Sequence, residues 1–455
     1  MSYKIGQNID LTISKITNSG QGLGFVDGIA VFVNNVCPDE TITAEITKVN
    51  KKFLEAKVIK VFNNSPYRVK PFCPMFNACG ACQLQFIDYE QQLVLKKEMV
   101  KDAFKNESDI QILDVEPSPL IKNYRHKIQY PVTQTKNSKK LIAGYFTPNS
   151  HNIVNIKYCP AQPDICNEII ETIKNTAPDF GISGYNELNH KGLLRHIVIR
   201  VSNYNKDILV TLVLNTNSKP QKIEKFAELI LKKYPQVKGL SINYNTFKNN
   251  LIMTDNTELI LGKNYIEEKL CDKIFKISTD TFFQINPYTA ENIFQFIKNY
   301  INENYSNPTI LDAYAGIATF GITLADISKK ITSVEINKNS INLAKQIADE
   351  EKITNIILIN DDTSNFLKNN SEKFDIAIID PPRKGCEKEV LDNLIKNTSK
   401  AIIYVSCNPN TLARDINYLQ EFGAKIKFVK PFDMFCHTNH IENVAIIEVE
   451  KINVQ

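Results

Sequence analysis

The chain has 455 residues, of which 43% are hydrophobic, and a formal net charge of +4. This length is greater than a single hydrophobic core usually supports, and it favours about three domains. No stretch approaches the roughly 20 continuous apolar residues of a membrane span, and the first residues lack the apolar core of a signal peptide. These features exclude membrane and secreted classes, and we expect a cytoplasmic protein.

The positive charge is concentrated in the middle of the chain. Residues 63–160 contain 13 Lys and Arg against 8 Asp and Glu, and residues 161–270 contain 14 against 12, whereas the remainder is slightly acidic. Such a surplus is compatible with a phosphate-backbone partner, and equally with lysines on solvated faces. In a reducing compartment the ten cysteines are not expected to form disulfides, so each thiol is a core residue, a ligand or a catalyst.

The first 62 residues read as short strands separated by turn signals, which is the pattern of a small β-barrel. We expect these strands at residues 10–16, 24–34, 40–49 and 53–62. A turn-rich segment at residues 63–66 then separates the barrel from a cysteine-rich segment.

Four cysteines have a spacing that no packing argument requires. Cys73, Cys79 and Cys82 follow a Cys-x5-Cys-x2-Cys pattern, and Cys159 is a distant fourth thiol. Four thiolates hold either an iron–sulfur cluster or zinc. The prolines after Cys73 and Cys159 favour the iron–sulfur cluster. The other cysteines have no spacing of note and are read as core or incidental: Cys37, Cys166, Cys271, Cys386 and Cys436.

Periodicity predicts a helix from residue 89 and a mixed α+β region over residues 121–270. In that region we expect strands at 127–132, 196–201 and 208–214 and a helix at 221–233. Beyond about residue 274, strands alternate with helices, which predicts a doubly wound, mostly parallel sheet with its ligand at the carboxyl ends of the strands. These strands are expected at 309–312, 331–336, 356–359, 374–380 and 401–406.

The segment at residues 311–321 ends a strand and enters a helix through a glycine-containing loop, a cofactor-binding pattern. Glu335 ends the next strand, where a carboxylate can accept both hydroxyls of an adenosine ribose. The middle glycine of the dinucleotide fingerprint is absent and Asp312 adds negative charge, so the cationic S-adenosylmethionine fits better than a pyrophosphate. A nicotinamide or flavin, or a purely structural turn, are the alternatives. Asp361 or Asp362 follows a third strand and suits either the adenine amine or a helix N-cap.

Two further segments carry candidate chemistry. Residues 380–383 (Asp-Pro-Pro-Arg) end the fourth strand, and the arginine stands where amino-group methyltransferases have an aromatic residue. Cys407 follows the fifth strand, where a thiolate can add to carbon 6 of a pyrimidine and activate carbon 5 for methylation. Glu442 is the candidate base that removes the carbon-5 proton. The alternatives are a small core cysteine, and metal binding by His437 and His440.

Together these features resemble the RNA 5-methyluridine methyltransferases, specifically the bacterial 23S ribosomal RNA branch with an N-terminal TRAM domain and a [4Fe-4S] cluster. The resemblance covers nearly the whole chain. The fourth-strand motif lacks the cysteine usual in the rival 5-methylcytosine enzymes, which favours uridine. Besides the cysteine cluster, the resemblance rests on residues 282–286, 311–321, 380–383, 406–411 and 437–442.

The resemblance implies a role for each matching residue. Cys407 would be the nucleophile, Glu442 the base, and Phe282 a wall for the everted uridine, although a core phenylalanine fits that position equally well. The segments at 123–127 and 195–200 are similar to family signatures that face RNA. Contacts to S-adenosylmethionine would come from Gln284, Tyr314, Thr319, Glu335, Asp361 and Asp380, and cluster ligation from Cys73, Cys79, Cys82 and Cys159.

The implied architecture is α/β, with an OB-like TRAM barrel at residues 1–62, an α+β domain carrying the cluster at 63–270, and a Rossmann-like methyltransferase domain at 271–455. A helix near 89–106 would pack on the last domain. The implied function is S-adenosylmethionine-dependent methylation of uracil carbon 5 in 23S rRNA, by a monomer that binds RNA and neither DNA nor membranes. A tRNA uracil-C5 methyltransferase, an iron–sulfur oxidoreductase and a non-catalytic RNA-binding module are the alternatives.

Overall fold

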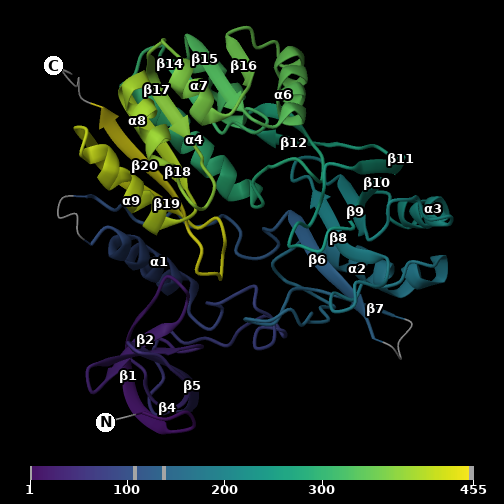
Figure 1. The fold of residues 1–455 in the computed structure, drawn as a ribbon, viewed down its shortest axis with the longest axis vertical. Coiled ribbons are helices and arrows are strands. Elements are labelled where there is room, and N and C mark those ends of the chain that lie inside the picture. The colour runs from purple at the N-terminus through teal and green to yellow at the C-terminus, as the bar shows by residue number, and fades with distance from the viewer. Residues whose placement is uncertain (1–2, 106–109, 136–139, 450–455) are drawn as a thin grey trace.

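The computed structural model describes residues 3–105, 110–135 and 140–449. Its strands form a closed barrel, a six-stranded sheet, a two-stranded sheet and a seven-stranded sheet, in chain order (Figure 1). In the described part of the chain, no helix is long and apolar enough to cross a membrane.

The N-terminal barrel closes in the strand order β1-β2-β3-β5-β4, which confirms the predicted barrel. Alternating residues of each strand point inward, and the core includes Ile13, Val31 and Ile42, which are fully buried. The strands are β1 (Asn8–Ile16), β2 (Gly22–Val26), β3 (Ile29–Val33), β4 (Thr41–Val49) and β5 (Phe53–Val61).

One strand prediction in the barrel is wrong. The single strand expected at 24–34 is the hairpin of β2 and β3, in which Val26 pairs with Ile29. The two residues between them, Asp27 and Gly28, both have positive φ angles (49° and 78°). An Asp-Gly pair between apolar runs is the usual signal of a two-residue hairpin turn, and it was present in the sequence.

The central domain, as we call the six-stranded sheet with its two helices, has the strand order β11-β10-β9-β8-β6-β7. Helices α2 and α3 pack on one face of this sheet, where Ile128 and Tyr130 of β6 join their apolar side chains. The elements are β6 (Lys127–Gln134), β7 (Leu141–Ala143), α2 (Asp164–Thr176) with a 3-10 turn at Ala177–Phe180, β8 (Leu194–Val201), β9 (Ile208–Leu214), α3 (Ile223–Lys233), β10 (Val237–Tyr244) and β11 (Thr257–Gly262).

The C-terminal domain, which we define as α4 to β20, contains the predicted doubly wound sheet, with five parallel strands and an antiparallel pair at one edge. Its order is β16-β15-β14-β17-β18-β20-β19. The strands are β14 (Thr309–Ala313), β15 (Lys330–Glu335), β16 (Ile356–Asn360), β17 (Phe374–Ile379), β18 (Thr398–Ser406), β19 (Ala424–Phe432) and β20 (Glu442–Val449). The helices are α4 (Pro287–Asn304), α5 (Thr319–Leu324) with a 3-10 turn at Ala325–Ile327, α6 (Lys338–Glu350), α7 (Thr363–Asn369), α8 (Lys388–Asn397) and α9 (Pro409–Gln420).

Strands β12 (Ile266–Leu270) and β13 (Lys273–Ile277) pair antiparallel between the two larger sheets. The boundary predicted after residue 270 falls inside this hairpin. The division of the chain into domains at residues 62 and 270 stays a prediction.

Helix α1 (Tyr89–Ala103) lies against α9 of the C-terminal domain (Figure 1). The end predicted near residue 106 lies outside the described residues. Lys96 of α1 and Asp433 form an ion pair of 2.5 Å, and both side chains are fully buried. The Asp433 carboxylate also accepts from the Tyr89 hydroxyl at 2.8 Å, so α1 holds the segment that leads from β19 to β20.

We expect Lys96→Met to lower the free energy of unfolding by about 3 kcal/mol, because removing one partner leaves the Asp433 charge buried and unpaired. Urea unfolding followed by circular dichroism measures this loss. Lys97→Met is the matched control, since Lys97 pairs with the exposed Asp114 and should cost less than about 1 kcal/mol. Equal losses in the two variants would contradict the assigned role of the buried pair.

Candidate active site

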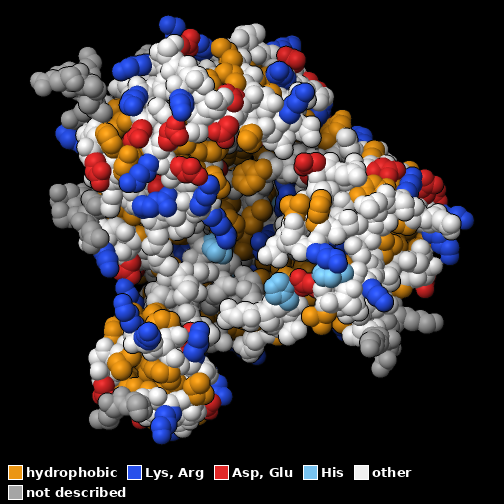
Figure 2. Space-filling view, viewed as in Figure 1, with side chains coloured by type: hydrophobic (Ala, Val, Ile, Leu, Met, Phe, Trp, Pro, Cys, Tyr) orange, Lys and Arg blue, Asp and Glu red, His pale blue; other side chains and the backbone are white. Residues whose placement is uncertain are grey.

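The carboxyl ends of the parallel strands β14 and β17 meet at one cavity of the C-terminal domain. Asp380 is the only charged residue among the described residues that line this cavity, and no lysine or arginine lines it. Figure 2 shows a hollow between the C-terminal and central domains with apolar side chains at its floor. Of the residues predicted to contact a cofactor, the cavity brings together Gln284, Tyr314, Thr319 and Asp380.

The loop after β14 is held close to β15 by a carboxylate. Glu335 accepts the backbone N–H of Gly316 at 2.9 Å and that of Asn337 at 2.8 Å. Tyr314, Gly316 and Ala318 all have positive φ angles, between 56° and 61°. Left-handed backbone costs a residue with a Cβ about 1–2 kcal/mol, so this loop shape is maintained by its surroundings.

Asp361 and Asp362 have different roles in the structure. Asp362 is the N-cap of α7, where its carboxylate accepts from the N–H groups of Ser364 and Asn365. Asp361 is not the cap, and its carboxylate accepts from the Asn365 side chain at 2.8 Å. Asp361 directly follows β16, as predicted, but it does not line the cavity that contains Gln284 and Asp380.

Two carboxyl groups at the strand ends have strongly raised pKa values. Burial raises the pKa of Asp312 to about 7, although its carboxylate accepts from Ser333 at 2.9 Å and from the Gly321 N–H at 3.0 Å. Burial, and then the like charge of Asp312, raise the pKa of Asp380 to about 7. A bound cation at this end of the sheet would favour the ionised form of both groups.

The candidate nucleophile and base lie together at the next strands. Cys407 directly follows β18 and Glu442 begins β20, with Ser406 paired to Asn443 between them. Burial raises the pKa of the Cys407 thiol, Glu442 raises it further, and the charge and hydrogen bond of Arg383 lower it. Burial and the charge of Asp380 raise the pKa of Glu442 well above its usual range, against the opposing effect of Arg383.

The two loops that carry these groups are tied to each other. The Arg383 carbonyl accepts from the Asn408 amide at 3.2 Å and from the Thr411 hydroxyl at 3.3 Å. The same asparagine caps α9 by accepting the N–H of Asn410. The loop after β17 is thereby fixed beside the thiol of Cys407.

Sequence reasoning gave Arg383 no role in the reaction, because its position was used only to exclude an amine target and to favour uridine over cytosine. We expect Arg383→Gln to move the rising limb of the pH–rate profile to higher pH, since loss of the cation raises the pKa of Cys407. At neutral pH the rate should fall and should recover on alkalinisation. Lys384→Gln is the control, because Lys384 is exposed and pairs with Glu387. An unshifted profile would contradict this role.

Phe282 is not a core phenylalanine, because 67% of its surface is exposed. It lines the same cavity as Gln284 and Asp380. The barrel also reaches this region. The Asn18 carbonyl accepts from the Asn439 amide at 2.5 Å, and the Asn18 amide donates to Asn410 at 3.4 Å.

The structure shows the surroundings of His437 and His440, the two candidate metal ligands. The two ring nitrogens of His437 lie 3.2 Å from the Gln92 amide and 3.0 Å from the Ile121 carbonyl. Burial lowers the pKa of both histidines to about 4. The contacts of His437 leave no ring nitrogen for a metal.

The four predicted cluster ligands line one small cavity between the cysteine-rich segment and the central domain: Cys73, Cys79, Cys82 and Cys159. The Gly80 N–H donates to the Phe146 carbonyl at 2.9 Å, which holds the segment against the central domain. Burial raises the pKa of Cys82 to about 12. Within the described residues, no three His, Cys, Asp or Glu side chains are arranged to hold a single metal ion.

Comparisons with known proteins find two family models and several RNA methyltransferases that are similar to this chain. A family model described as tRNA (Uracil-5-)-methyltransferase matches residues 88–450, and a TRAM domain model matches residues 3–59. RNA methyltransferases described as uncharacterized, from Oceanobacillus iheyensis and Clostridium acetobutylicum, are each 34% identical over 450 and 453 residues. These alignments cover 97% and 98% of both chains, respectively.

Among solved structures, the chain is similar to the Pyrococcus abyssi tRNA (uracil-54, C5)-methyltransferase in complex with S-adenosyl-L-homocysteine. The TM-score is 0.78 and the sequence identity is 27%. The match covers 96% of this chain and 100% of the other.

Proposed function

The chain belongs to the tRNA (uracil-5-)-methyltransferase family and carries an N-terminal TRAM domain. We propose that it methylates carbon 5 of a uridine in 23S ribosomal RNA, which is the substrate of the branch that its sequence resembles. Membership of this family makes the chain an RNA (uracil-5-)-methyltransferase that uses S-adenosylmethionine. The observation that carries the proposed mechanism is the grouping of Cys407, Arg383 and Glu442 beside the cavity at the strand ends.

Cys407 begins the proposed reaction. Its thiolate forms a bond from sulfur to carbon 6 of uracil, and the electrons of the carbon 5–carbon 6 double bond move to the carbonyl oxygen at carbon 4. Carbon 5 then becomes a nucleophile, which the unmodified ring is not. The Arg383 guanidinium assists by favouring the thiolate, since an opposite charge lowers the pKa of a thiol.

Glu442 completes the proposed reaction. After carbon 5 has received the methyl group, the Glu442 carboxylate removes the proton from that carbon. The electron pair restores the double bond, and the bond from sulfur to carbon 6 breaks. Glu442 must be ionised for this step, so we expect the rate of product release to rise with pH.

S-adenosylmethionine supplies the electrophilic methyl group when it is bound. Gln284, Tyr314, Thr319 and Asp380 would hold it in the cavity at the strand ends, with Glu335 and Asp361 reaching it from the neighbouring strands. An acidic cavity suits this cofactor because it carries a sulfonium and an ammonium. The raised pKa values of Asp312 and Asp380 agree with a site built for a cationic ligand.

We propose that the four cysteines of the small cavity bind a [4Fe-4S] cluster. Their shared cavity supports this, and a cluster distributes its ligands over four irons, so it does not need the close grouping that a single ion requires. The cluster would join Cys159 of the central domain to the segment of Cys73, Cys79 and Cys82. We assign it no electron transfer, because the proposed methylation moves no net electrons.

We expect protein purified without oxygen to contain iron and sulfide and to absorb near 400 nm, and Cys82→Ser to lose both. Loss of the cluster should also lower the melting temperature, because metal binding contributes to folding free energy. Cys166→Ser is the control, since Cys166 is buried outside the cavity. Stoichiometric zinc in place of iron would contradict the assignment.

The 23S target is tested by mass mapping of 5-methyluridine in RNA from cells with and without the intact gene. We expect one or more uridines of 23S rRNA to lose the methyl group in the deletion strain and regain it when the gene is restored. A transfer RNA target is the second candidate, because the similar solved structure acts on uridine 54 of tRNA. Loss of the methyl group in tRNA alone would replace the 23S proposal, and unchanged methylation in both would defeat it.

We further propose that the enzyme acts as a cytoplasmic monomer. No disulfide joins any of the ten cysteines, which supports a reducing compartment. The contacts of Asn18 bring the RNA-binding barrel to the active site within one chain, so no second copy is needed to complete it.

A further inference from the structure

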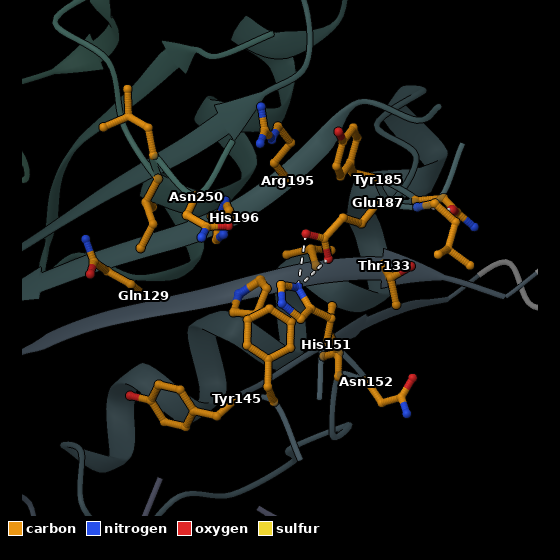
Figure 3. A pocket seen from close by; sticks show the side chains of 18 of the residues that line it. Gln129, Thr133, Tyr145, His151, Asn152, Tyr185, Glu187, Arg195, His196 and Asn250 are labelled. Carbon is orange, nitrogen blue, oxygen red and sulfur yellow. Dashed lines mark hydrogen bonds and ion pairs between the residues drawn. The ribbon is translucent and has the colours of Figure 1, made fainter. Parts of the chain in front are cut away.

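A further cavity, in the central domain, lies apart from the candidate active site. It has a volume of about 590 Å³ and is lined by β6, β8 and the loops around residues 145–153, 185–188 and 249–252. Figure 3 shows His151 and Glu187 facing each other at its centre, with Arg195 and Tyr185 on the same side of the cavity. We propose that this cavity binds an unpaired nucleobase of the RNA substrate, several nucleotides away from the methylated uridine.

The cavity occupies the face of the central sheet that its helices leave open. Side chains alternate along β6, so Ile128 and Tyr130 point into the core and Gln129 and Thr133 point into the cavity. The opposite end of the same face is covered, because Thr211 bonds to Thr279 at 2.7 Å. The open face of the sheet therefore extends from its covered end, beside the C-terminal domain, to the cavity.

Strand β6 connects this open face to the candidate active site. The N–H of His126, directly before β6, donates to the carbonyl of Ile285 at 2.7 Å, and Ile285 follows Gln284 of the cofactor cavity. Thr133 is seven residues further on, which is about 23 Å along an extended strand. One RNA strand of several nucleotides spans such a distance, so one molecule can reach both places.

The chemistry of the lining favours a base over a phosphate. The Arg195 Nη1 already donates to the carbonyls of Asn245 and Phe247, and its guanidinium lies over the Tyr185 ring. Glu187 would repel an anion, and its own partner is His151 at 3.0 Å. An uncharged, flat ligand with hydrogen-bonding edges is not repelled by Glu187 and does not need the Arg195 Nη1 as a partner. Its edges would find the side-chain amides of the lining, which belong to Gln129, Asn152, Asn186, Asn249 and Asn250.

Two unpartnered polar atoms and one aromatic surface complete the site. The Arg195 Nε and the His196 Nδ1 are buried without a hydrogen-bond partner, in side chains that line the cavity. The exposed His151 ring lies 5.3 Å from the Phe146 ring and contacts Glu187, so it offers an aromatic surface on which a base can stack. Leu188, which is 96% exposed, stands at the rim where a bound base would cover it.

The inference rests on RNA being the substrate, and the test separates the two claims. The probe is unmethylated 23S rRNA and tRNA from cells that lack the gene. We expect His151→Ala to raise KM for the RNA about tenfold, since one base–aromatic contact is lost. Leu188→Ala should raise KM less, since it removes only apolar surface that the base would cover. In both variants kcat and the Kd for S-adenosylmethionine should be unchanged. Tyr204→Ala is the control, because Tyr204 is an exposed aromatic residue of the same domain outside the cavity.

Ultraviolet crosslinking of the same RNA to the wild-type protein provides a second readout, with the crosslinked peptides identified by mass spectrometry. We expect nucleotide adducts on residues 145–153 or 185–196. Normal methylation with unchanged KM in both variants, or adducts confined to the C-terminal domain and barrel, would overturn the inference and leave the proposed function standing. If the wild-type protein methylates neither RNA, the proposed function itself fails.

Discussion

Cys407→Ala should lower the rate of RNA methylation on the order of 10⁴-fold or more, because without the thiolate carbon 5 of uracil is not a nucleophile. The measurement is single-turnover transfer of a labelled methyl group from S-adenosylmethionine to unmethylated RNA. Cys407 follows β18 and is partly exposed, so alanine should leave the fold intact.

The control for Cys407→Ala is binding. The Kd values for S-adenosylmethionine and for RNA should stay within about twofold of the wild type, since Cys407 does not line the cofactor cavity. Cys271→Ala, which changes a cysteine in the turn between β12 and β13, should keep most of the activity. A Cys407→Ala enzyme that retains more than a tenth of the wild-type rate would exclude the covalent mechanism.

Glu442→Gln should slow turnover about 10²–10⁴-fold, the usual contribution of a general base, and should trap the reaction after methyl transfer. Glutamine has the same shape but cannot take the carbon-5 proton, so the bond between sulfur and carbon 6 cannot break. The expected result is a methylated RNA that stays attached to the protein on a denaturing gel, with label from the methyl group in the band.

The order of steps is tested by the double variant. Cys407→Ala/Glu442→Gln should show no band, because the bond that Glu442 helps to break never forms. Glu442→Asp should release product faster than Glu442→Gln, since a carboxylate is restored at a shorter reach. Normal turnover by Glu442→Gln would mean that another base removes the carbon-5 proton. Asp380 would then be the first candidate, because its charge acts on Glu442.

The pKa values of the buried carboxyls predict how stability depends on pH. Asp312 and Asp380 have pKa values near 7 in the folded chain, against about 4 for an unfolded aspartate. The folded state thus holds protons that the unfolded state releases, so these groups lower stability as pH rises from about 4 to 7. S-adenosylmethionine should offset the loss, which thermal unfolding at pH 5 and pH 8 with and without the cofactor would measure.

Local patterns in the sequence were sufficient to predict the doubly wound sheet and the position of the loops that form the candidate site. Alternating strands and helices after residue 274 predicted the doubly wound sheet, and Glu335 was placed at the end of β15 by its position after an apolar run. The antiparallel strands β19 and β20 were not predicted, because β20 follows a long irregular segment held by α1 through Lys96 and Asp433. Such long-range pairs leave no local pattern.

Contacts between distant segments were the least predictable. The sequence could not decide whether Asp361 or Asp362 caps α7, since both fit, nor whether Phe282 is buried. Only the segment at 195–200 gave a sequence signal for the cavity of the central domain, because the other walls come from segments around His151, Glu187 and Asn250 that meet only in the folded sheet.

The bond between Cys407 and the target base is the central step of the proposed reaction, and 5-fluorouridine tests it most directly. Fluorine replaces the proton that Glu442 must remove, so substrate RNA containing this base should become permanently attached to the wild-type enzyme in the presence of S-adenosylmethionine. Peptide mass spectrometry should place the RNA, with its added methyl group, on Cys407. No attachment by an enzyme that actively methylates the unsubstituted RNA, or attachment to a different residue, would contradict the account.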